Sequence, residues 1–121
     1  MVRLAQELAD LSNSLPSEYT NSMFARVDKD RVDTIKAVIT GAEGTPYAHG
    51  CFEFDIFCDN NYPNDPPKMN LQTTGNGNVR FNPNLYACGK VCLSLLGTWR
   101  GQQSENWDSK ISTILQVLVS V

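Results

Sequence analysis

The chain has no long apolar stretch and no marked excess of charge of one sign. Within its 121 residues, no apolar run approaches the roughly 20 residues that a membrane span needs, so we expect no membrane contact. Ten basic residues stand against 13 acidic ones, and the net charge of −3 gives no sign of a surface for nucleic acid. Repeats, linkers and low-complexity segments are also missing, which favours one globular domain over residues 1–121.

Histidine is scarce as well, because His49 is the only one in the chain. A mechanism of the Cys-His protease type would therefore have to pair His49 with Cys92. The flanks of Cys92 lack the local signature of that protease group, and His49 lies in a Pro-Tyr-x-x-Gly turn. We expect His49 to be a surface loop residue, and a cysteine protease ranks as the third functional alternative.

The four cysteines allow either disulfides, a zinc site or free thiols. The first seven residues carry an acid early and have no apolar signal core, so secretion and disulfides are not expected. Cys51 and Cys58 are seven residues apart in one predicted strand and point to opposite faces, which disfavours a shared metal. We expect reduced thiols in a cytoplasmic or nuclear protein, with no metal ion.

The hydrophobic pattern predicts an α+β fold. Leucines at helical spacing predict an amphipathic helix over residues 3–15, which Pro16 closes; the leucines are Leu4, Leu8, Leu11 and Leu15. After a polar connection over 17–22, short alternating segments predict four strands, at 23–27, 34–40, 51–58 and 69–73. This order is typical of an antiparallel meander with helices packed against it.

The C-terminal part predicts a polar loop and a second helix. The segment 97–107 is long and polar, and its two tryptophans, Trp99 and Trp107, should anchor it to the body. Asp108 is the expected N-cap of a helix that runs to Val121. Its apolar face would consist of Ile111, Ile114, Leu115, Leu118 and Val121.

The most informative stretch runs from residue 78 to residue 96. It turns at Asn82-Pro83-Asn84, loops through Cys88-Gly89-Lys90 and ends in an apolar run over 91–96. A cysteine at the point where a polar loop becomes apolar, such as Cys92, can be held rigidly while its sulfur stays reachable. The alternative interpretation makes Cys92 a small core residue, since free cysteine is among the most buried residue types.

This stretch resembles the active-site segment of ubiquitin-conjugating enzymes. That family carries a His-Pro-Asn tripeptide with its nucleophilic cysteine eight positions after the asparagine, which is the spacing of Asn84 and Cys92, although Asn82 replaces the histidine. Two further blocks agree in order, Gly-Thr-Pro-Tyr-Ala-His-Gly at 44–50 and Tyr-Pro-Asn-Asp-Pro-Pro at 62–67. Within the family, the chain is most similar to a subgroup of giant enzymes that also carry BIR repeats.

The resemblance implies a chemistry of ubiquitin transfer. Cys92 would accept ubiquitin from the activating enzyme as a thioester and pass it to a lysine amine or a ligase cysteine. Asn84 would stabilise the oxyanion or the loop itself, and Asn82 and Tyr86 are candidates for orienting an incoming amine. No cofactor is expected, because ATP is used by the activating enzyme. The alternative from another class is a non-catalytic module of the same fold that binds ubiquitin or a ligase.

The resemblance also implies partners. Ubiquitin, an activating enzyme docked on the 3–15 helix, and a ubiquitin ligase or protein substrate are expected, with neither nucleic acid nor membrane. The family's docking helix uses basic residues, whereas Arg3 is the only one here, and Asn64 and Asp65 occupy the usual ligase loop. Further helices follow the last one in the family. The expectation is therefore a domain without its C-terminal helices, which self-associates through that end.

Overall fold

The computed structural model describes residues 2–14, 17–18, 21–31, 33–73, 75–81 and 83–121. Within these residues, two α-helices and five strands follow one another: α1 (Val2–Ser14), β1 (Ser17–Glu18), β2 (Asn21–Val27), β3 (Thr34–Thr40), β4 (Cys51–Phe57), β5 (Lys68–Leu71) and α2 (Ile114–Ser120). The strands form one antiparallel sheet in the order β1-β2-β3-β4-β5. The predicted α+β meander is confirmed, with one two-residue edge strand, β1, in the segment expected to be a plain connection.

The sheet forms where side chains alternate between the core and the solvent. β3 occupies the predicted range and lies between β2 and β4 in the sheet. Its inward-facing side chains, Ile35, Ala37 and Ile39, are buried in the core. On β4, Phe54 and Ile56 point the same way and are 1% exposed. The predicted opposition of the two β4 cysteines is also confirmed, because Cys51 is exposed and Cys58, just after the strand, is buried.

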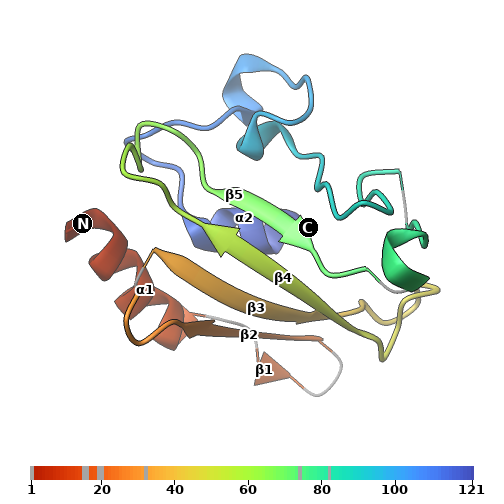
Figure 1. Cartoon of the computed structure of the whole chain (residues 1–121). Coiled ribbons are helices and arrows are strands. Elements are labelled where there is room, and N and C mark those ends of the chain that lie inside the picture. The colour runs from red at the N-terminus through yellow and green to blue at the C-terminus, as the bar shows by residue number, and fades with distance from the viewer. Residues whose placement is uncertain (1, 15–16, 19–20, 32, 74, 82) are drawn as a thin grey trace.

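Both helices contribute to the core of the sheet. Leu4 and Leu11 of α1 are buried as the leucine spacing predicts, and Leu8 is partly buried. Leu15 and Pro16 lie outside the described residues. Figure 1 shows α2 passing behind the sheet, where its buried side chains Ile114, Val117 and Leu118 join the same core. The described residues contain the helices α1 and α2, and neither is long and apolar enough to cross a membrane.

The start of α2 differs from the prediction. Thr113, and not Asp108, is the N-cap: its Oγ1 accepts a hydrogen bond from Gln116 N, and the Gln116 side chain accepts one from Thr113 N, each at 3.2 Å. Asp108 instead closes a turn, in which its Oδ1 accepts from Lys110 N at 2.9 Å. The predicted core residue Ile111 lies in that turn and is 70% exposed, so its assignment to the apolar face was wrong.

A buried carboxylate joins the two helices to the loop after β4. Glu7 is 6% exposed, and its oxygens accept hydrogen bonds from Arg3 Nε at 2.7 Å, Tyr62 OH at 2.7 Å and Ile114 N at 3.0 Å. Arg3 also donates to the carbonyls of Ser109 and Ser112. A carboxylate is tolerated in the interior only when it is paired in this way. The one basic side chain of α1 is therefore committed to the body of the domain.

Candidate active site

The site begins with a short antiparallel pairing of the segments 84–86 and 90–92. Cys92 N donates a hydrogen bond to the carbonyl of Asn84 at 2.8 Å, and two residues away Tyr86 N donates to the Lys90 carbonyl at 3.0 Å. Leu85 and Val91, between these two pairs, form an isolated bridge. The pairing places Cys92 and Asn84 directly opposite each other.

The two sides of this pairing have different surroundings. Val91 is 1% exposed, and Leu85 packs against the same core. On the other side, Asn84 and Lys90 are exposed and Tyr86 is half-buried. This alternation holds the pairing to the domain through its apolar side and exposes Asn84 and Lys90 on the polar side, where Cys92 is the buried exception.

The nucleophile candidate itself is more buried than the sequence predicted. Cys92 is 2% exposed, whereas Cys88, four residues earlier in the loop, is exposed. The expectation of a reachable sulfur is wrong for this conformation, because Cys92 is almost fully covered although Asn84 and Lys90, on the same side of the pairing, are exposed. A reaction at this thiol therefore requires a local displacement of the side chains around it.

The backbone amides beside Cys92 are already occupied. Cys92 N donates to Asn84, and Leu93 N donates to Thr98 Oγ1 at 3.0 Å. Neither amide is left to donate to a carbonyl oxygen that becomes negative during acyl transfer. Asn84, the predicted donor for that charge, is the residue that the pairing brings opposite Cys92.

Two cations lie against the ring of Tyr86. The Arg80 guanidinium carbon is 4.3 Å from the ring centroid, and Lys90 Nζ is 5.7 Å from it. Arg80 also donates to the carbonyl of Pro83 at 2.9 Å. Arg80 was missed in the sequence, where nothing connects it to Tyr86. Asn82, the other predicted supporting residue, lies outside the described residues.

Three other loop residues had predicted roles, namely His49, Trp107 and Trp99. His49 is exposed in its loop, as predicted, and within the described residues no hydrogen bond joins it to Cys92. Trp107 is half-buried, and its Nε1 donates to the Pro63 carbonyl at 2.7 Å, so this tryptophan anchors its segment as predicted. Trp99 is 58% exposed, so its predicted anchoring role was wrong.

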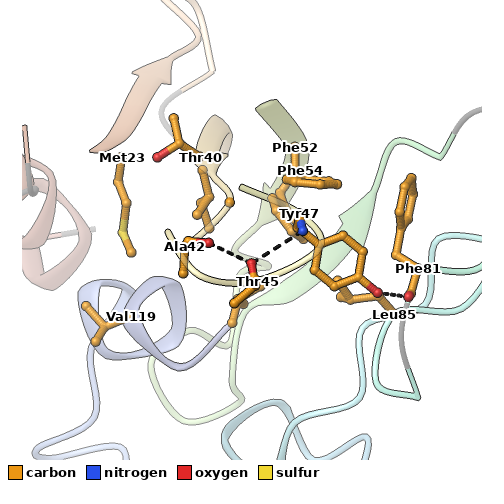
Figure 2. Close-up of a pocket in the computed structure, with 13 residues that line it drawn as sticks. Met23, Thr40, Ala42, Thr45, Tyr47, Phe52, Phe54, Phe81, Leu85 and Val119 are labelled. Atoms are coloured by element: carbon orange, nitrogen blue, oxygen red, sulfur yellow. Dashed lines mark hydrogen bonds between the residues drawn. The ribbon is translucent and has the colours of Figure 1, made fainter. Parts of the chain in front are cut away.

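Beside the site, an apolar hollow of about 420 Å³ opens between the sheet and the end of α2. Figure 2 shows Tyr47 and Phe81 at one end of the hollow, where the Tyr47 hydroxyl donates to the Phe81 carbonyl, and Val119 at the other end. Leu85, from the pairing that carries Asn84, also lines it. No local pattern in the sequence predicted this hollow, because its lining comes from segments that are distant in the chain.

The model of the family described as ubiquitin-conjugating enzyme matches residues 3–121. The chain belongs to this family. The human protein "Dual E2 ubiquitin-conjugating enzyme/E3 ubiquitin-protein ligase BIRC6" is 56% identical over 119 residues, which are 98% of this chain and 2% of that protein. The "Probable ubiquitin-conjugating enzyme protein 17" of Caenorhabditis elegans is 55% identical over 98% of this chain and 16% of its own length. The chain thus spans a small part of the length of these relatives.

Solved structures agree with the family assignment. Human ubiquitin-conjugating enzyme E2 G1 has a TM-score of 0.78 and 26% identity to this chain, over 98% of this chain and 88% of that one. A ubiquitin-conjugating enzyme domain from Toxoplasma gondii has a TM-score of 0.74 and 30% identity, over 98% of this chain and 69% of that one. The predicted family and the likeness to its giant subgroup are confirmed. Ubiquitin, an activating enzyme and ligases are the partner classes that this family implies.

Proposed function

We propose that this chain is an active ubiquitin-conjugating domain with Cys92 as its nucleophile. The observation that carries the proposal is the hydrogen bond of 2.8 Å from Cys92 N to the Asn84 carbonyl, which fixes the predicted nucleophile opposite the predicted oxyanion donor. The family match over residues 3–121 supplies the substrate class, a ubiquitin thioester.

The proposed reaction has two acyl transfers. The Cys92 thiolate attacks the carbonyl of the thioester between ubiquitin and the activating enzyme; a new C–S bond forms, the old one breaks, and the released thiolate takes a proton. A lysine amine then attacks the Cys92 thioester, forming an amide and releasing the Cys92 thiolate, while the amine loses a proton to solvent. A ligase cysteine would instead exchange thioesters. Sulfur suits both steps as nucleophile and leaving group.

The charge that develops on the carbonyl oxygen needs a donor. One fixed donor aimed at that oxygen is worth about 3–4 kcal/mol in acyl transfer. We assign this donor to the Asn84 side chain, because Asn84 lies opposite Cys92 in the pairing. Tyr86 would orient the incoming amine from the same side of the pairing, with Asn82 as a second candidate.

The test is a charging assay with activating enzyme, ATP and ubiquitin. The unaltered chain should form an adduct that a reductant removes, and Cys92→Ser should give an adduct that resists the reductant. Cys88→Ser is the matched control, because Cys88 is exposed in the same loop and should not carry ubiquitin. A reductant-sensitive adduct that persists in Cys92→Ala would overturn the assignment of the nucleophile.

The burial of Cys92 favours a second candidate, a non-catalytic module that binds ubiquitin or a ligase. Iodoacetamide labelling of the native chain separates the two. The exposed Cys51 and Cys88 should react first in either case. An active enzyme should also lose its Cys92 thiol within the time of the charging assay, whereas a non-catalytic module should keep Cys92 unlabelled until it unfolds.

Docking of the activating enzyme on α1 is the third part of the proposal. Because Arg3 is bonded to Glu7 and to two carbonyls, the docking surface has to use the exposed side chains of that helix, such as Gln6 and Asp10. We further propose that the chain acts without a cofactor of its own, in the cytoplasm or nucleus, in keeping with its four unpaired thiols.

The last part of the proposal is self-association through the C-terminal end of α2. Val119 and Val121 are 61% and 38% exposed, and both line the apolar hollow. Projecting valines and a hollow on one face are self-complementary, so a second copy related by a twofold axis is the occupant that we propose.

A further inference from the structure

The hydroxyl of Thr98 is bonded to the backbone on both sides of Cys92. Thr98 Oγ1 donates to the carbonyl of Val91 at 2.7 Å and accepts from the amide of Leu93 at 3.0 Å. The backbone adds a third link, because Thr98 N donates to the Leu93 carbonyl at 3.3 Å. One side chain therefore connects the residue before the nucleophile to the residue after it.

A tight turn brings Thr98 back to this position. After Cys92 the chain forms the short 3-10 turn η2 (Ser94–Leu96), which ends at Gly97 with a φ of 69° and a bond from Gly97 N to the Ser94 carbonyl at 3.0 Å. This left-handed residue reverses the chain, so that Thr98 faces the segment 91–93. The geometry is local and does not involve α2 or the apolar hollow.

We infer that Thr98 is a positioning residue for Cys92, an inference that rests on the proposed ubiquitin transfer. Its hydroxyl, together with the bond from Cys92 N to Asn84, fixes both peptide planes next to Cys92 and so the direction of its sulfur. Acyl transfer is sensitive to that direction, since a displacement of about 1 Å at a reacting centre costs about 100-fold in rate. Thr98 itself touches neither ubiquitin nor the thioester in this role.

The experiment compares three variants of the full chain. Thr98→Val keeps the shape and removes the hydroxyl, and Thr98→Ser keeps the hydroxyl and removes a methyl group. Thr73→Val is the matched control, because Thr73 Oγ1 donates to the Ala87 carbonyl at 2.7 Å and so holds the same loop at a point farther along the chain from Cys92. Thioester formation is followed against the concentration of charged activating enzyme, and discharge to free lysine in a single turnover.

Thr98→Val should lower the kcat of charging and the single-turnover rate of discharge by about 10- to 100-fold, with KM unchanged. Thr98→Ser should restore both rates to within about threefold, and Thr73→Val should leave both rates unchanged even if its melting temperature falls. A Thr98→Val enzyme with unaltered rates overturns the inference. So does a Thr73→Val enzyme that is slowed equally, because the hydroxyl would then act only on loop stability.

Iodoacetamide labelling of Cys92 tests the role of Thr98 independently of the proposed function. If the unaltered chain forms no ubiquitin adduct, the proposed function fails, while the labelling rates still decide the role of Thr98. Loss of the two hydroxyl bonds should speed labelling of the buried Cys92 by about fivefold or more in Thr98→Val, and not in Thr73→Val, at denaturant concentrations where both remain folded. Equal labelling rates would overturn the positioning role.

Discussion

Gly89 has little conformational or spatial freedom in the loop before Cys92. Its φ of +97° lies in the region that side-chain-bearing residues rarely adopt, and an added Cβ would lie 2.4 Å from Asn70 Oδ1 and 2.7 Å from the Leu71 carbonyl. The close approach has a structural use, since Leu71 N donates to the Gly89 carbonyl at 2.8 Å and ties the loop to β5.

We predict that Gly89→Ala lowers the free energy of unfolding by about 2–5 kcal/mol, from backbone strain together with the clash at β5. Gly44→Ala is the matched control, because Gly44 also has a positive φ, +80°, but nothing lies within 4 Å of an added Cβ. It should lose only the strain, about 1–2 kcal/mol. Urea unfolding measures both values, and equal losses in the two variants would show that the contact with β5 costs nothing.

The buried thiol of Cys58 should make the free energy of unfolding depend on pH. Burial, together with the smaller effect of the nearby carboxylates of Glu7, Asp33 and Asp59, raises the pKa of its thiol from an ordinary value of 9.0 to about 12. Between these two pH values the unfolded chain loses this proton and the folded chain keeps it. The contribution of Cys58 to stability is therefore complete below pH 9 and is lost as the pH rises toward 12.

The expected slope is a loss of about 1.4 kcal/mol per pH unit above pH 9. Urea unfolding from pH 8 to pH 10 checks it, and Cys58→Ala should reduce the slope although it also lowers stability at every pH. Part of the slope should remain, because burial and the Glu7 hydrogen bond also raise the pKa of Tyr62. Cys51→Ala, which removes an exposed thiol, serves as the control. An unchanged slope in Cys58→Ala would contradict the prediction.

At the residue scale, the sequence predicted Cys92 and Asn84 as site residues and not how deeply they are buried. Their position opposite each other comes from a short local pairing that was found in the structure. The exposure of Cys92 depends on packing from the whole domain, and the same holds for Trp99. Neither quantity has a local signal in the chain.

At the element scale, α2 illustrates a choice between two local signals. Asp108 and Thr113 are both good N-cap residues, and the sequence alone favoured Asp108 because it precedes the first apolar residue of the stripe. In the fold, Glu7 accepts a hydrogen bond from Ile114 N, so the first turn of α2 is fixed by a carboxylate from α1. β3 offered no such choice, because its alternation agrees with only one register.

We predict that Thr113→Ala lowers the free energy of unfolding by about 1 kcal/mol, because the amide of Gln116 loses its acceptor. Thr113→Ser keeps the acceptor and should cost a few tenths of that amount. Thermal melts of the two variants measure the difference. Should Thr113→Ala melt like the unaltered chain, the Glu7 carboxylate alone would be sufficient to start α2.

At the scale of the whole molecule, one polar contact and one apolar core hold distant parts together. Glu7 joins α1, the loop at Tyr62 and the start of α2, while the three buried residues of α2 close the core behind the sheet. The end of α2 is less well covered, since Val119 faces the solvent at the rim of the hollow. The sequence predicted an uncovered apolar end of this helix, and the hollow beside it was found only in the structure.

The last prediction is that this end mediates weak self-association. Two copies related by a twofold axis would each place Val119 against the hollow of the other and remove apolar surface from water. Sedimentation velocity over a range of concentrations should show a rising mass for the unaltered chain and a monomer for Val119→Asp. Val119 is 61% exposed, so the change should not alter the melting temperature of the monomer. Ile111→Asp is the matched control, since Ile111 is 70% exposed and lies outside the hollow. A monomer at every concentration for the unaltered chain, or equal dissociation by both variants, would contradict this interface.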